Sequence, residues 1–182
     1  MSATPESSAA PRSPSRRGEV LLGVAAIVLM AATMRLPVAA LSPLAGRIDA
    51  DIPLSALALG ALGTAPPLAF ALAGLLAPRV GRRWGLETAL LLALLAMIAG
   101  HLLRAAAVDY TMLLAATVLL LLGAGFGNVL LPAAVKSITP TRIGTMTAAY
   151  AMIMSVGAAV PPLVAVPLAE LGDWRLALAV WA

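Results

Sequence analysis

The chain alternates long apolar runs with short polar breaks. The runs lie near residues 20–41, 55–77, 86–104, 111–135, 144–169 and 174–182. A helix needs about 20 mostly apolar residues to cross the hydrocarbon core of a bilayer. The first five runs therefore predict membrane-spanning helices. The sixth has nine residues, so we expect it to be the incomplete beginning of another span.

The segment 1–18 lacks this pattern. It is rich in Ser, Pro and Ala and carries Arg12, Arg16 and Arg17. A segment with so few apolar side chains does not fold alone, so residues 1–18 predict a disordered tail and residues 19–182 a single transmembrane domain. A signal peptide is the alternative. Its apolar region spans only about 7–15 residues, which is shorter than the run over 20–41.

Composition excludes a water-soluble fold. The chain is 62% hydrophobic and 11% charged, with a mean hydropathy of +1.00, whereas soluble domains are about half apolar and about a quarter charged. The lipid bilayer is therefore an expected partner. The absence of Cys and the single His leave no disulfide, thiolate or zinc cluster to expect, and we expect no metal or cofactor.

Basic residues follow a topological bias rather than a nucleic-acid-binding pattern. If the tail and every second break face the cytoplasm, the opposite side holds only Arg47, Arg104 and Arg175. The cytoplasmic side then holds eight: Arg12, Arg16, Arg17, Arg79, Arg82, Arg83, Lys136 and Arg142. Because cytoplasmic loops are enriched in Lys and Arg, we expect a multi-pass protein of the cell (inner) membrane with a cytoplasmic N-terminus and no nucleic-acid partner.

Proline positions suggest an internal repeat. Pro132 follows Pro37 by 95 residues, and Pro161 follows Pro66 by the same distance. Two matches at one offset favour a duplicated three-helix unit, whose second copy would enter the membrane inverted. Chance is the alternative, because Pro is common in membrane helices. We expect helix bends at six prolines: Pro37, Pro66, Pro67, Pro132, Pro161 and Pro162.

A basic motif follows the second run. Gly74 precedes Pro78-Arg79, and Gly81 precedes Arg82-Arg83. This stretch resembles the cytoplasmic signature loop of the major facilitator superfamily, Gly-three residues-Asp-Arg-x-Gly-Arg-Arg, with Pro78 in place of the acid. The alternative is a plain cationic loop at the cytoplasmic surface.

Further motifs resemble the cyanate and nitroimidazole transporter branch of that superfamily. They are Thr33-Met34-Arg35-Leu36-Pro37, Ser42-Pro43-Leu44, Gly125-Phe126-Gly127-Asn128 and the segment 131–136. The resemblance implies an all-α membrane protein. It would be the N-terminal six-helix bundle of a major facilitator fold, built as a 3+3 inverted repeat with its sixth helix truncated. It also implies secondary active transport of a small solute, with a missing C-terminal six-helix half as partner.

Arg35 is the leading candidate for solute binding. An arginine within a membrane span is costly and by default functional; snorkelling to the interface or a fixed ion pair is the alternative. A guanidinium suits a planar anion or a nitro group. We expect Thr33 and Asn128 near the solute, and we add Tyr150 and Met154, which share a helix face.

Three further features have structural interpretations. Gly123, Gly125 and Gly127 predict a thin helix that its neighbours approach on several sides. The Leu- and Ala-rich run 86–104 predicts a lipid-facing helix, with His101 as an interfacial polar residue near its end.

Four functions are considered. They are a carrier of a small anion or nitroaromatic compound, an efflux carrier of an uncharged substrate, a non-transporting assembly or sensor subunit, and an intramembrane serine protease. The protease would need Ser155 and His101 to meet, although we expect them at different depths. No Asp or Glu lies deep within the first five runs, so a proton-coupling carboxylate is expected in the missing half.

Overall fold

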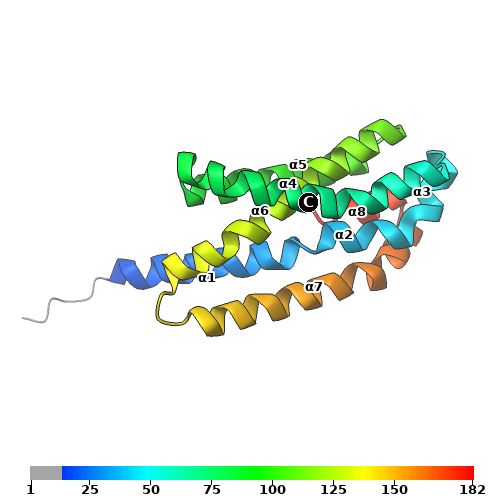
Figure 1. The fold of residues 1–182 in the computed structure, drawn as a ribbon. Helices are drawn as coiled ribbons and strands as arrows, with labels where there is room; N and C mark the ends of the chain where they lie inside the picture. The colour runs from blue at the N-terminus through cyan, green and yellow to red at the C-terminus, as the bar shows by residue number, and fades with distance from the viewer. Residues whose placement is uncertain (1–13) are drawn as a thin grey trace, which may run out of the picture.

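The computed structural model describes residues 14–182 as an all-helical bundle (Figure 1). Within that range it contains eight α-helices, one 3-10 helix (η1) and no strand. The elements are α1 (Pro14–Thr33), α2 (Leu36–Leu41), η1 (Ser42–Leu44), α3 (Ala45–Asp51), α4 (Ala56–Trp84), α5 (Leu86–Ala105), α6 (Tyr110–Ile138), α7 (Ile143–Leu171) and α8 (Trp174–Ala179).

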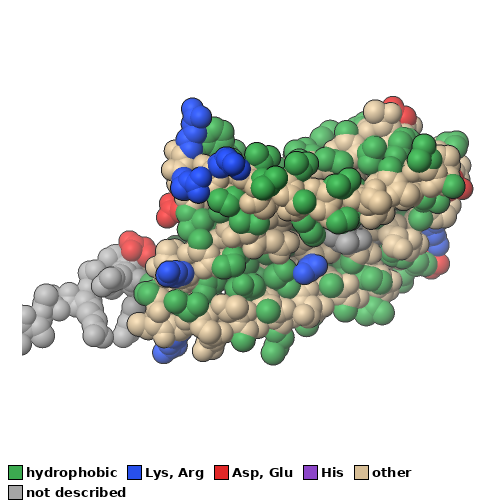
Figure 2. All heavy atoms as spheres, viewed as in Figure 1, with side chains coloured by type: hydrophobic (Ala, Val, Ile, Leu, Met, Phe, Trp, Pro, Cys, Tyr) green, Lys and Arg blue, Asp and Glu red, His purple; other side chains and the backbone are tan. Residues whose placement is uncertain are grey.

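Four of these helices, α4 to α7, are long and apolar enough to cross a membrane. They correspond to the second to fifth apolar runs. In the space-filling view, basic side chains gather at the end of the molecule where α4 ends and α7 begins (Figure 2). We call this the basic end, and the opposite end, where α3, Asp109 and Glu170 lie, the acidic end.

The first apolar run is not one continuous helix. The helix α1 ends at Thr33, Met34 and Arg35 form a turn, and α2 then begins. Pro37 lies in the first turn of α2, where its missing N–H costs nothing, but it could not continue α1 without losing a hydrogen bond. The expected single span over 20–41 is therefore broken. The helix α1 also begins at Pro14, within the expected tail; residues 1–13 lie outside the described residues.

The structure also differs from the sequence prediction around Gly81, where a loop was expected and a helix is found. The helix α4 continues past Pro78 to Trp84, and the Arg79 side chain donates to the Leu75 carbonyl one turn earlier. The turn into α5 consists of Gly85, whose φ of 86° only glycine adopts readily. The basic motif therefore forms the last turns of α4. The expectation of a loop arose because the apolar run ends at the first charged residues, whereas the helix continues beyond them.

Two large and two small hydrophobic clusters make up the interior of the described residues. The central cluster comprises Ile27, Met30, Ala31, Met34, Ala93, Met97, Ala124, Leu131, Ala134, Val135 and Met154. The acidic-end cluster comprises Leu44, Ile48, Ile52, Leu54, Ala58, Leu62, Ala107, Leu113, Ala165, Ala169, Trp174, Ala177 and Leu178. The helices α6 and α7 each contribute buried residues to both of these clusters, so these two helices run from one cluster to the other.

The glycines of α6 bring three neighbouring segments close to it. A Cβ built on Gly123 would lie 2.6 Å from the Ala93 carbonyl oxygen of α5. One on Gly125 would lie 2.6 Å from the Ala73 Cβ of α4, and one on Gly127 would meet the Met34 sulfur. The prediction of a thin helix approached on several sides is confirmed. This packing makes α6 the centre of the bundle.

The helix α5 has one outward and one inward face. Leu91, Leu95 and Leu102 are exposed, in agreement with a lipid-facing helix. The prediction for His101 is wrong: its side chain is only 1% exposed and lies beside the backbone of Leu178 in α8. Its position near the helix end does not reveal that α8 covers this face.

The proline repeat is only partly reflected in helix geometry. Pro66 lies in the first half of α4, whereas Pro161 lies in the second half of the equally long α7. The two helices run in opposite directions (Figure 1). Both proline pairs therefore lie nearer the acidic end than the basic end. The offset of the repeat does not align these two helices position by position.

Candidate functional site

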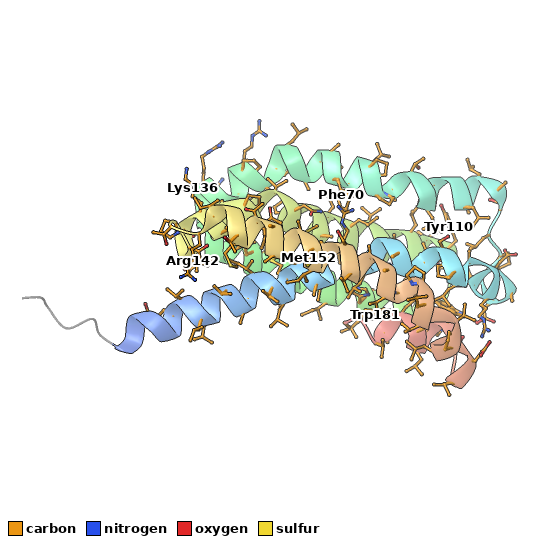
Figure 3. All side chains as sticks on the ribbon, turned by 90° about the horizontal axis from the view of Figure 1, so that it is seen from below. Phe70, Tyr110, Lys136, Arg142, Met152 and Trp181 are labelled. Atoms are coloured by element: carbon orange, nitrogen blue, oxygen red, sulfur yellow. The ribbon has the colours of Figure 1, made fainter. Side chains whose placement is uncertain are left out.

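A cavity of about 310 Å³ lies between the break in the first span and the middle of α7. It is lined by Arg35, Ala151, Met154, Ser155 and Ala158. In Figure 3, α7 lies along α1 and α2. The close approach depends on Gly157, since a Cβ there would lie 2.8 Å from the Ala32 carbonyl oxygen. The short side chains of α7 leave open the space in front of Arg35.

The Arg35 side chain is exposed to this cavity. Among the described residues it makes no hydrogen bond and no ion pair. Its position in a turn between two helices keeps it off the packed helix faces. Five N–H donors in a planar fork are therefore open to a ligand.

Met154 is the candidate that the structure places beside Arg35. It lines the cavity and is also a member of the central cluster, against which Tyr150, one turn earlier, is packed. Tyr150 therefore supports the wall of the cavity, although it is not among its lining residues.

Thr33 faces away from Arg35. It lines an apolar groove of about 470 Å³ between α1, α5 and α6, and its hydroxyl donates to the Met30 carbonyl at 3.0 Å. Thr33 is the last residue of α1, whereas Arg35 lies in the turn that follows, so the two side chains point in different directions. Asn128 is half-buried on α6, directly after the glycine that contacts Met34, and it does not line the Arg35 cavity.

Ser155 is a lining residue that the sequence interpretation did not assign to the solute. Its hydroxyl donates to the Ala151 carbonyl at 3.0 Å, which leaves its oxygen lone pairs available to a ligand. Ala151, Ser155 and Ala158 are spaced four and three apart, the spacing of one helix face. This stripe of small residues opposite an intramembrane arginine is the signal that would have indicated the cavity.

The basic end provides a different surface. Arg82 and Arg83 are exposed at the end of α4, and a Cβ on Gly81 would contact the Leu130 side chain of α6 at 3.3 Å. Gly74 has open space around it. The basic motif therefore combines exposed cations with one close helix contact at Gly81.

The comparisons with known proteins identify the family. The Major Facilitator Superfamily profile matches residues 21–182. The chain belongs to the major facilitator superfamily. This major facilitator chain is 37% identical over 156 residues to the 2-nitroimidazole transporter of Escherichia coli (strain K12), covering 85% of the chain and 39% of the relative. It is 35% identical over 161 residues to the uncharacterized transporter YycB of Bacillus subtilis (strain 168), covering 87% of the chain and 40% of the relative.

These findings confirm the resemblance to the nitroimidazole transporter branch and the all-α fold of a partial major facilitator half. The major facilitator chain spans about two-fifths of the length of these relatives. Its kinship with transporters argues against the protease interpretation. The geometry agrees, because Ser155 lines the Arg35 cavity while His101 lies against α8.

Proposed function

We propose that this chain contributes the N-terminal part of a secondary transporter that moves a small anionic or nitro-bearing solute through the cell membrane by alternating access. The observation that carries the proposal is Arg35. It faces a cavity in the middle of the membrane-spanning region and has no acidic partner among the described residues. The relative named for 2-nitroimidazole transport supports the same solute chemistry.

A charged group in the membrane needs a partner, because burial of a lone charge is expensive. The acids of α4–α7 lie at the helix ends: Glu87 is the second residue of α5, and Glu170 is the residue before the last of α7. A solute with two adjacent oxygens could accept two hydrogen bonds from the guanidinium at once. Cyanate-like anions and nitroaromatic compounds are the solutes we propose for this site.

The proposed site includes Ser155 and Met154 on α7, with Asn128 and Thr33 as outlying candidates. If transport is proton-driven, the titrating carboxylate belongs to the C-terminal half, which is the partner we propose for this bundle. The lack of a carboxylate deep in α4–α7 supports this assignment.

The distribution of basic residues supports a cytoplasmic basic end and N-terminus. Because the chain has no Cys, a single Gly81→Cys variant can report the side. We expect an impermeant thiol reagent to label it only after the cells are opened, and a Gly46→Cys variant at the acidic end to be labelled in intact cells. Labelling of Gly81→Cys in intact cells would reverse the topology.

Uptake of 2-nitroimidazole by cells expressing the complete coding sequence tests the function. We expect Arg35→Ala to abolish saturable uptake and Arg35→Lys to reduce it, since an ammonium is a point charge without the two-pronged geometry. Arg142→Ala is the matched control, because it also removes an exposed cation but lies far along α7 from the cavity. Equal uptake by Arg35→Ala and Arg142→Ala, at equal expression, would favour an uncharged substrate bound elsewhere.

A further inference from the structure

The cavity beside Arg35 is lined by two polar side chains that differ in hydrogen-bonding character. Arg35 comes from the turn between α1 and α2, and Ser155 comes from the middle of α7. A guanidinium offers only donors, whereas a hydroxyl has one donor and two acceptor lone pairs. What Ser155 offers to a solute therefore depends on where its hydrogen is directed.

The hydroxyl hydrogen of Ser155 is used within α7. Its Oγ donates to the Ala151 carbonyl, one turn earlier, at 3.0 Å. Thr117 makes the same bond to the Leu113 carbonyl at 2.7 Å, and Thr64 also bonds one turn back. In a membrane-spanning helix such a carbonyl is always within reach, whereas water is scarce. Ser155 therefore presents an oxygen to the cavity that accepts hydrogen bonds.

The other side chains that line the cavity are apolar. Ala151 and Ala158 are small, so they leave the surface of α7 flat on either side of Ser155. Met154 adds a thioether, and a polarisable sulfur makes favourable contacts with aromatic rings. A wall of this kind suits a flat ring better than a hydrated ion.

The volume of the cavity also favours a ring over a very small anion. The cavity holds about 310 Å³, which corresponds to about ten water molecules at roughly 30 Å³ each. A triatomic anion such as cyanate would leave most of this space filled by water. Sites for organic ligands begin at about 300 Å³, so a small nitro-substituted ring matches the space more closely.

We propose that Ser155 is a specificity-determining residue that accepts a hydrogen bond from a ring N–H of the solute, while Arg35 donates to the solute's oxygens. The preferred solute is then a flat heterocycle that carries a nitro group and an N–H donor. A cyanate-like anion has no hydrogen to donate, so its electron pairs would face those of the Ser155 oxygen. This inference rests on the proposed function, because it takes the Arg35 cavity as the solute site.

A comparison of two ligands tests the role of Ser155. They are 2-nitroimidazole and 1-methyl-2-nitroimidazole, which keeps the nitro group but lacks the ring N–H. Equilibrium binding of each is measured with the product of the complete coding sequence in lipid nanodiscs, in buffer acidic enough to keep the ring N–H protonated. The quantity of interest is the ratio of the two affinities, which we call the N–H preference.

Ser155→Ala is expected to lower the N–H preference by about two- to tenfold, which is the contribution of one neutral hydrogen bond. Ser155→Thr keeps a hydroxyl that can bond one turn back, as Thr117 does, and is expected to keep the preference. Ser137→Ala is the matched control. Ser137 of α6 donates to the Ala134 carbonyl at 2.9 Å but does not line the cavity, so the preference should stay unchanged.

Arg35→Ala separates this inference from the proposed function, because both ligands carry the nitro group and both should bind more weakly to that variant. If Arg35→Ala weakens both ligands but Ser155→Ala leaves the N–H preference unchanged, the role of Ser155 is overturned and the proposed function stands. If the unsubstituted protein binds neither ligand, the proposed function and the role of Ser155 are overturned together. A preference that is lost equally in Ser155→Ala and Ser137→Ala also overturns the role of Ser155.

Discussion

The helices α6 and α7 have the same length of 29 residues and similar apolar content, yet the interior buries 56% of one span and 17% of the other. The difference lies in where small residues occur. Gly123, Gly125 and Gly127 let three segments approach α6, whereas α7 has one comparable contact, at Gly157. Hydrophobicity thus predicts that both cross the membrane, and the pattern of small side chains decides which becomes the centre.

The difference in packing between α6 and α7 also bears on the proposed function. Because α6 is surrounded, most of its side chains pack against neighbouring helices, and the groove that it lines with α1 and α5 is apolar. The helix α7 touches α1 at Gly157 and leaves its neighbouring turns open, so Ala151, Ser155 and Ala158 can line a cavity. In our proposal the packed helix stabilises the bundle and the open helix provides the binding surface.

The largest expected effect compares one leucine on each helix. Leu131 of α6 is 1% exposed and Leu163 of α7 is 74% exposed. Leu131→Ala is expected to cost about 2–5 kcal/mol in the free energy of unfolding, because it leaves a cavity in the central cluster. Leu163→Ala is expected to change it by less than about 0.5 kcal/mol. Unfolding in mixed micelles measures both, and equal losses would remove the distinction between the helices.

The next effect concerns the glycines. Gly123→Ala forces a methyl group against the Ala93 carbonyl, and overpacking of this kind costs about 1–3 kcal/mol. Gly144→Ala, in the first turn of α7 where nothing lies nearby, is the matched control. It is expected to be neutral or stabilising by up to about 1 kcal/mol, since Ala favours helix. Thermal unfolding measures both, and stabilisation by Gly123→Ala would contradict the close approach of α5.

The smallest effect is a pH dependence at the acidic end. Hydrogen bonds from Arg175 first, and then from Trp174, hold the pKa of Asp51 below its usual value. A lowered pKa means that this stabilisation is fully present above the ordinary aspartate pKa of about 3.9 and is lost as the pH falls through the lower folded value. The thermal unfolding midpoint is therefore expected to receive no contribution to its pH dependence from Asp51 between pH 8 and pH 5, and to fall in stronger acid. An Asp51→Asn variant with the same loss of stability in strong acid would point to another titrating group.

The sequence predicted the four long spans α4 to α7 in their order, because each needs a long apolar run, but it predicted the first run as a fifth unbroken span. It did not predict the break at Met34–Arg35, since Leu36 and Val38 continue the apolar run on the far side of the turn. It also stopped the second span at Ala77, because charged residues look like a loop even where they extend a helix to Trp84.

The candidate site was predicted in part. Arg35 was recognisable because an arginine in a span is rare, and Met154 lies beside it. Thr33 was chosen for its place in the Thr33-Met34-Arg35 motif and as the repeat counterpart of Asn128, but it faces another groove. It is the last residue of α1, whereas Arg35 lies in the turn that follows. Likewise, the burial of His101 depends on how α8 packs over α5, which a single sequence does not specify.

Equilibrium binding of 2-nitroimidazole to the nanodisc-embedded product of the complete coding sequence, with 2-methylimidazole as the ligand lacking the nitro group, tests the central claim most directly. Hydrogen bonds to a charged group contribute about 1.5–3 kcal/mol each, and about 1.4 kcal/mol is tenfold in affinity. We expect Arg35→Ala to weaken binding of the nitro compound at least about tenfold by this conversion. Arg35→Lys should be intermediate, and Arg142→Ala should bind normally. Unchanged affinity in a correctly folded Arg35→Ala variant would contradict the account.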